Sequence, residues 1–118
     1  MKAIIINPFY FTIELREIAE QDIQRILAAP IVIEYLGNRD VVLCNSMAPL
    51  ISYAFFTIQE TKVAGIGIIV QATYSEVDGK QVIVFKDCKS DVKDIKPHWY
   101  LDIGRHADDM REVKVRNF

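Results

Sequence analysis

The chain begins with a short apolar run that gives way at once to alternating residues. Residues 2–6 form a largely β-branched strand, of which residues 3–6 are apolar on both faces, as in a central strand. Asn7 and Pro8 then supply turn chemistry. Residues 11–16 alternate apolar and polar side chains with the period of a half-buried strand. The pattern predicts a β-hairpin with its first strand central in a sheet and covered by a helix on one side.

The hydrophobic period changes to that of a helix over residues 19–29. Ile23, Ile26 and Leu27 recur at helical spacing among polar residues. Pro30 cannot continue a helix and is expected to end it. We therefore expect one short amphipathic helix packed on the sheet.

The next stretch predicts a second hairpin followed by an ambiguous link. Apolar residues alternate over 31–35, the turn sequence GNRD follows, and residues 41–44 form the returning strand. Residues 45–57 permit a short helix capped by Asn-Ser or a strand rich in aromatic residues. We favour a short helix or irregular link, and then a strand near residues 56–59.

A third hairpin is predicted from the longest apolar stretch. Residues 63–74 are expected to form one long strand, which turns at an Asp-Gly pair and is followed by a partner strand at 81–85. Gly65 and Gly67 lie inside this strand, where glycine permits a bulge or a close backbone contact. Because Ile-Ile-Val follows Gly67, instead of a third glycine and a helix, the dinucleotide-binding fingerprint does not fit.

These elements predict an α+β fold, a largely antiparallel sheet of hairpins with one amphipathic helix at about 19–29 packed on it. A chain of 118 residues has the size of a single domain. Residues 1–85 would form its hairpin and helix core. Residues 86–118 would form a charged C-terminal segment, with a last edge strand over 111–118.

Composition narrows the functional class only slightly. A net charge of −2 argues against a dedicated nucleic-acid binder. The opening apolar run is too short for a secretory signal, and no stretch reaches the roughly 18 apolar residues of a membrane span. We therefore expect a cytoplasmic protein. Because the cytoplasm is reducing, Cys44 and Cys88 are predicted to be free thiols.

Candidate catalytic groups are few and belong to the C-terminal segment. They are His98, His106, Asp108 and Asp109. Imidazoles and carboxylates could serve a small hydrolase or a metal or ligand binder. Adjacent carboxylates in a charged segment are more often solvated, and the cysteine and histidine spacing does not match a zinc site. No metal or cofactor is predicted, and the sequence leans against an enzyme.

The sequence KPHWYLDIG at residues 96–104 is an apolar island in this charged segment. Its Trp99 is predicted to plug the core, since Leu101 and Ile103 alternate with it on an extended chain. The alternative is a binding surface, because interface hot spots favour Trp, Tyr and Arg. The candidate binding residues are His98, Trp99, Tyr100 and Arg105.

Several short words resemble a known family. The opening MKAIIINP, the next segment FTIELREI, and the later YLGNRDVVLCN and AGIGIIVQA are similar to a family of small proteins of unknown function from phages, prophages and plasmids. The resemblance covers roughly residues 1–75. It implies an accessory protein of a mobile element and brings no catalytic residues.

The leading expectation is therefore a non-enzymatic accessory protein that binds another protein or itself, as a homodimer, through a sheet edge or residues 96–104. No membrane partner is expected. A weaker alternative is nucleic-acid binding through residues 86–116. Eight basic residues lie there, but seven interspersed acidic residues weaken their field.

Overall fold

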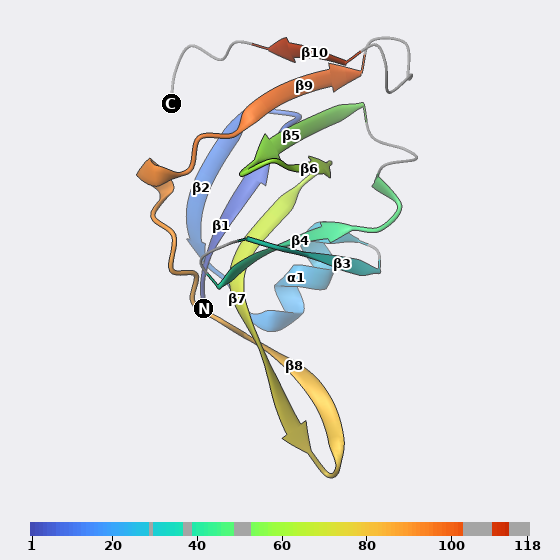
Figure 1. Ribbon diagram of the computed structural model, residues 1–118, viewed down its shortest axis with the longest axis vertical. Coiled ribbons are helices and arrows are strands. Elements are labelled where there is room, and N and C mark those ends of the chain that lie inside the picture. The colour runs from blue at the N-terminus through green and yellow to red at the C-terminus, as the bar shows by residue number, and fades with distance from the viewer. Residues whose placement is uncertain (29, 37–38, 49–52, 103–109, 114–118) are drawn as a thin grey trace.

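The computed structural model describes residues 1–28, 30–36, 39–48, 53–102 and 110–113. This part of the chain is mostly antiparallel sheet with one α-helix, compatible with the expected α+β class (Figure 1). The molecule measures 48 by 29 by 24 Å. One hairpin extends away from the body and accounts for the elongated shape (Figure 1).

The strands form two sheets. The elements are β1 (Lys2–Asn7), β2 (Thr12–Glu17), α1 (Glu20–Leu27), β3 (Ile31–Tyr35), β4 (Asp40–Asn45), β5 (Ala54–Ile58), β6 (Thr61–Ala64), β7 (Gly67–Val77), β8 (Lys80–Lys86), the 3-10 helix η1 (Val92–Asp94), β9 (His98–Asp102) and β10 (Met110–Val113). The large sheet has the order β2-β1-β7-β4-β3, with β8 also paired to β7, and the small sheet has the order β10-β9-β5-β6. Every described strand pair is antiparallel.

The first strand is central, as its apolar run predicted. β1 lies between β2 and β7, and its residues 3–6 are all buried. Ala3 and Ile5 join the core on the helix side, whereas Ile4 and Ile6 join the core that faces the small sheet. A strand needs apolar residues at consecutive positions when both faces of its sheet are covered. The triple isoleucine therefore reflects a layer on each side.

The helix is shorter than residues 19–29. α1 ends at Leu27, because Ala28 adopts a left-handed conformation with φ of 57° and its N–H donates to the Gln24 carbonyl. This local cap stops the helix before Pro30 is reached. Ile23 and Leu27 are buried and pack with the helix-side residues of the large sheet.

The prediction of a single long strand over residues 63–74 is wrong, because this stretch belongs to two strands. β6 ends at Ala64 and pairs back onto β5, Gly65 turns with φ of 74°, and β7 starts at Gly67 in the other sheet. The apolar pattern continues through this crossing because both strands are buried, so the pattern alone does not mark the break. The expected strand near 56–59 is β5, which starts two residues earlier; residues 49–52 of the preceding link lie outside the described residues.

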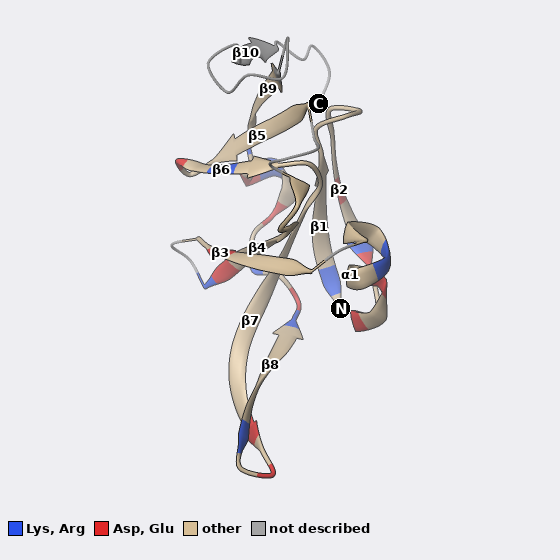
Figure 2. Cartoon of the chain, turned by 90° about the vertical axis from the view of Figure 1, so that its right-hand side faces the viewer, with Lys and Arg blue, Asp and Glu red and all other residues tan. Residues whose placement is uncertain are grey.

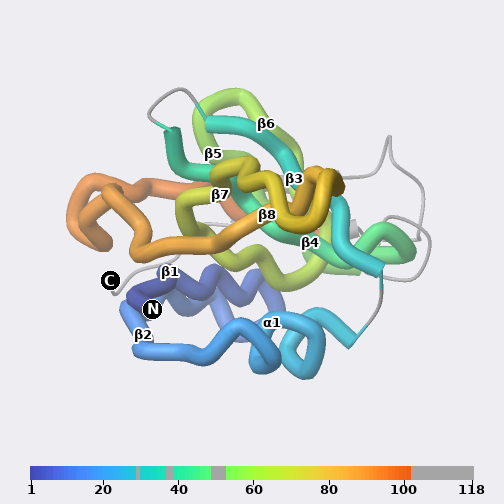
Figure 3. Tube along the Cα trace, turned by 90° about the horizontal axis from the view of Figure 1, so that it is seen from below, coloured from blue at the N-terminus to red at the C-terminus, as the bar shows by residue number. Residues whose placement is uncertain are grey.

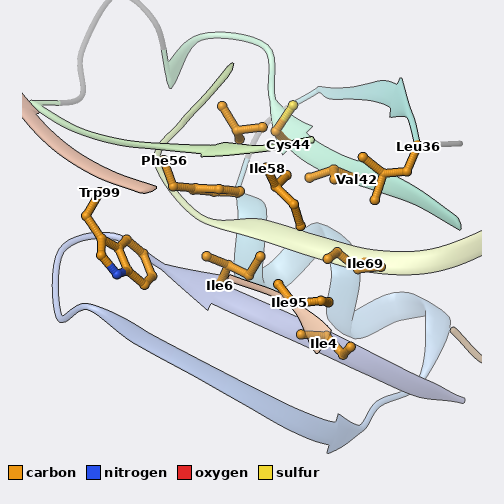
Figure 4. Close-up of a cluster of buried hydrophobic side chains, with 11 residues drawn as sticks. Ile4, Ile6, Leu36, Val42, Cys44, Phe56, Ile58, Ile69, Ile95 and Trp99 are labelled. Carbon is orange, nitrogen blue, oxygen red and sulfur yellow. The ribbon is translucent and has the colours of Figure 1, made fainter. Parts of the chain in front are cut away.

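The body has three layers. α1 lies on one side of the large sheet, and β5 and β6 lie on the other side (Figure 3). The core between the two sheets is filled mainly by β-branched and aromatic side chains, shown in Figure 4. Its buried members are Ile4, Ile6, Leu36, Val42, Cys44, Phe56, Ile58, Val63, Ile69, Ile95 and Trp99.

Gly67 allows the closest contact between the two sheets. A Cβ atom at this position would lie 2.6 Å from Cζ of Phe56 and 3.0 Å from Cγ1 of Val42. Phe56 is fully buried and pairs with Val63 and Trp99 in the small sheet. The expected close backbone contact at this glycine is confirmed: the ring of Phe56 fills the space where a side chain would stand.

We predict that Gly67→Ala destabilises the protein by about 1–3 kcal/mol, the usual cost of overpacking a core. The measure is the free energy of unfolding from urea titration. Phe56→Leu should relieve the contact, so the double variant should lose less stability than the sum of the two single variants. Additive losses would show that the ring and the glycine are not coupled.

Candidate functional site

The most exposed part of the fold is the arm, which we define as residues 71–86 of β7 and β8. Over residues 67–69, β7 lies between β1 and β4 in the large sheet, and its pairing with β4 continues to Gln71. Beyond Gln71, β7 pairs only with β8 among the described residues, in register from Gln71 opposite Lys86 to Val77 opposite Lys80. Residues 73–83 of this ribbon are exposed (Figure 1). The arm thus leaves the body as a two-stranded ribbon with two free edges.

An apolar stripe runs from the helix-side core out along one face of the arm. Ala72 and Phe85 are opposite each other and pack as half-buried residues on that core. The next pair on the same face is Tyr74 opposite Ile83, and Tyr74 is 59% exposed. The other face carries exposed Val82. Exposed apolar side chains that continue a core are typical of a binding surface.

Tyr74 also fixes the direction of the arm. Its hydroxyl lies 2.9 Å from the hydroxyl of Tyr35, at the end of β3. This hydrogen bond raises the pKa of Tyr35 above its ordinary value. The phenol of Tyr35 therefore stays neutral at physiological pH, and the hydrogen bond joins the arm to an outer strand of the body.

Charge is confined to the two ends of β8. Lys80 stands beside the tip, near Asp78, and Lys86 stands at the root, while residues 81–85 are uncharged (Figure 2). Asp78 and Gly79 both have positive φ, 52° and 77°, as in the tight turn that joins two strands directly.

The tight turn also determines which backbone groups of β8 face outward. Val77 and Lys80 flank the turn and exchange hydrogen bonds in such a hairpin, and the bonded pairs then recur at every second residue. Gln81, Ile83 and Phe85 therefore direct their N–H and C=O groups away from β7. These groups line the outer edge of β8.

A buried carboxylate holds the root of the arm. Asp40 is fully buried and starts β4 opposite Gln71. It accepts hydrogen bonds from the Lys89 N–H at 2.9 Å, from the Ser90 N–H at 2.8 Å and from the Ser90 hydroxyl. A buried charge is tolerated only when it is well hydrogen-bonded, and these donors meet that need.

The segment that connects β8 to β9 (residues 87–97) is tied to three strands near this point. The Gln71 side chain donates to the Asp87 carbonyl at 2.6 Å, and the Cys88 N–H donates to the Lys2 carbonyl at 2.9 Å. Further along, Ile95 is buried in the core between the sheets. The arm therefore grows from a fixed base.

The two cysteines are free thiols, as expected. Burial, with the charge of Glu34, raises the pKa of Cys44. Burial, with the charge of Asp40, raises the pKa of Cys88. A raised thiol pKa leaves less thiolate at neutral pH, so neither cysteine has the environment of a reactive nucleophile.

Residues 98–102 of the predicted apolar island form β9, where Trp99 is a core residue, and Ile103 lies outside the described residues. Its side chain is 3% exposed and makes edge contacts with Phe11 and Phe56, with ring centroids 5.8 and 6.3 Å apart. The plug prediction is confirmed. Tyr100 is half-buried and His98 is exposed. The proposed binding role of this set stays a prediction, and Arg105 lies outside the described residues.

The catalytic alternative cannot be assembled from the described part of the chain. Of its four residues, only His98 is described, while His106, Asp108 and Asp109 fall in the range 103–109 that is not. In the described ranges, no group of three or more His, Cys, Asp or Glu side chains could hold a metal ion. No helix in this part of the chain is long and apolar enough to span a membrane. The expected last strand over 111–118 overlaps β10, which comprises Met110–Val113, and residues 114–118 lie outside the described residues.

Sequence analysis missed the arm as a site and also missed Asp40. The uncharged QVIVF between two lysines was visible, but it predicted an ordinary core hairpin. Asp40 looked like a turn residue because it follows Gly-Asn-Arg. No local signal marks a carboxylate that is buried by a segment 50 residues later.

Comparison of the chain with protein-family models, with curated proteins and with solved structures finds no match. The resemblance to a family of phage and plasmid proteins therefore stays a prediction. Function has to be argued from the arm and its base.

We predict that Asp40→Asn lowers the free energy of unfolding by about 1–3 kcal/mol, because the amide turns one acceptor into a donor facing buried N–H groups. Hydrogen exchange at Lys89 and Ser90 should accelerate more than exchange in α1. Asp94→Asn, an exposed carboxylate on the same connecting segment, is the control and should be near neutral. If the two substitutions changed stability and hydrogen exchange equally, Asp40 would not be what holds Lys89 and Ser90 in place.

We also predict that Trp99→Ala lowers stability by about 3–5 kcal/mol, the usual cost of deleting a large buried aromatic side chain. Thermal melting followed together with light scattering measures this loss. Tyr10→Ala removes a ring that is 77% exposed and should leave the melting temperature almost unchanged. An unchanged melting temperature for the Trp99 variant would refute the plug.

Proposed function

We propose that this is a non-enzymatic accessory protein of a mobile element that works in the cytoplasm by binding another protein. The binding edge is the outer edge of β8, where a strand of the partner adds to the arm. The observation that carries the proposal is the arm itself, an exposed ribbon with a row of outward backbone groups at Gln81, Ile83 and Phe85. Free edges of this kind accept a further strand.

Strand addition would also stabilise the arm. A two-stranded ribbon alone is marginal in water, whereas three strands with an apolar face are stable. An added strand would cover Ile83 and Phe85 on one face and Val82 and Val84 on the other. Backbone hydrogen bonds would supply affinity, and alternate side-chain contacts would supply specificity.

The edges of β2 and β6 are less suited to a partner strand. β2 carries Glu14, Arg16 and Glu17 as exposed residues, and β6 has four residues including exposed Lys62. Charged side chains on an edge discourage pairing with another chain. β8 has lysines only at its ends, so its middle is more open to pairing than β2 or β6.

Nucleic-acid binding through residues 86–116 is the less supported function. The exposed lysines of the connecting segment alternate with Asp87, Asp91 and Asp94. Lys93 is paired with Asp91 at 3.6 Å. A field divided in this way gives weak attraction for phosphates.

The test places a photo-crosslinking amino acid at Gln81 in the full chain, expressed in the cell that encodes it. Gln24, an exposed glutamine on α1, is the matched control position. We expect Gln81 to give a discrete adduct with a different protein, identified by mass spectrometry, that Gln24 does not give.

The captured protein is then purified and its affinity measured. Ile83→Pro removes an outward N–H without removing a bond to β7, so it should weaken binding at least tenfold while the fold persists. Ile83→Thr keeps the N–H and should bind more tightly than the proline variant. Equal capture at both glutamines, or binding that Ile83→Pro leaves unchanged, would refute the proposal.

A further inference from the structure

We infer that a second copy of this chain occupies the outer edge of β8, in an antiparallel pair centred on Val82. The inference rests on the proposed function, in that it uses the same edge: a second copy fills this edge when the other protein is not bound to it. The result is a continuous ribbon of four strands, β7 and β8 from each copy. Residues 81–85 carry no charge, so two copies of this stretch can approach without repulsion.

Symmetry and backbone direction leave few ways to form this pair. A two-fold axis requires some residue of β8 to stand opposite its own copy. The outward groups at Gln81, Ile83 and Phe85 must also meet outward groups of the other strand. Centring on Val82 satisfies both conditions. Val82 then stands opposite its own copy, Gln81 exchanges hydrogen bonds with Ile83 of the second copy, and Ile83 does so with Gln81 of the second copy.

Charge selects this register over the next one. Centring on Ile83 would place Lys80 opposite Lys86 of the second copy at both ends of the pair. Centring on Val82 instead places Lys80 opposite Val84 and brings Lys86 level with Asp78 of the second copy. Like charges directly opposite destabilise a strand pair, and opposite charges stabilise it.

A register centred on Val84 is blocked by the body. It would extend the pair past Lys86 to Asp87 and Cys88. The Cys88 N–H is already bonded to the Lys2 carbonyl, and Asp87 accepts from the Lys2 N–H at 2.7 Å. The edge of β8 is therefore open only toward the tip, where the Val82 register lies.

Cysteine crosslinking tests the register in the purified full chain. In a pair centred on Val82, the two copies of this residue form a non-hydrogen-bonded pair with Cα atoms about 4.5 Å apart, within disulfide reach. Val82→Cys should therefore give a covalent dimer under mild oxidation. Val84→Cys should give no covalent dimer, because the two copies of this residue are four positions apart along the strands. The parent chain, whose only cysteines are Cys44 and Cys88, should give none either.

Sedimentation tests the association itself. The parent chain should show a concentration-dependent dimer at micromolar concentration, and Val82→Lys should raise the dissociation constant at least tenfold by placing two charges opposite each other. Val77→Lys adds the same charge to an exposed position of β7 and should change it little. Circular dichroism checks that each variant is folded.

Two outcomes would overturn the inference. A parent chain that stays monomeric at every concentration excludes self-pairing, and a dimer that crosslinks through Ile83→Cys but not through Val82→Cys excludes this register. Neither removes the proposed function, which fails if Gln81 captures no other protein in the cell, if Gln24 captures it equally, or if Ile83→Pro leaves its binding unchanged. A monomer that still captures such a protein leaves strand addition in place with a different occupant.

Discussion

The ring of Phe56 packs directly onto the backbone of Gly67, and this contact sets the distance between the two sheets. A side chain at position 67 would stand 2.6 Å from the ring, so the sheets could not approach as they do. Trp99 packs edge-on against the same ring from β9. The core between the sheets is therefore packed around Gly67. Because Gly67 has no side chain, the ring of Phe56 can lie against its backbone.

The buried carboxylate of Asp40 extends this order to the edge of the body. It lies in a row with Gln71 and Lys86, the last position at which β7 is paired on both sides. Asp40 accepts three hydrogen bonds from Lys89 and Ser90, which follow the end of β8. These bonds hold the connecting segment against the start of β4 in the large sheet. The body thus ends in a fixed row, and beyond it residues 73–83 of the arm are exposed.

The arm is consequently a rigidly rooted ribbon whose own interactions are few. It combines an apolar stripe, the Tyr35–Tyr74 hydrogen bond and an outer edge without charge over residues 81–85. The body buries apolar residues in its cores, although Tyr10, Leu15 and Tyr53 are also exposed there; in the arm, Tyr74, Val82 and Ile83 stay at the surface. The interaction surface is assigned to β8, and not to β2 or β6, because residues 81–85 are uncharged, whereas β2 exposes Glu14, Arg16 and Glu17 and β6 exposes Lys62.

The sequence by itself determined the local elements, because each depends on neighbours in the chain. Alternation defined one strand in each of the first two hairpins, and the Asp-Gly pair defined the turn of the arm. The apolar run with the triple isoleucine indicated a central strand covered by the helix on one side, and the position of Trp99 indicated a core residue. Tertiary structure decided the rest. Only the pairing of strands shows that β6 and β7 belong to different sheets, since burial gives both the same apolar pattern. Asp40 holds Lys89 and Ser90 only because a segment distant in sequence folds over it. Whether a residue such as Ile83 is buried or exposed likewise depends on distant segments, which no local sequence pattern encodes.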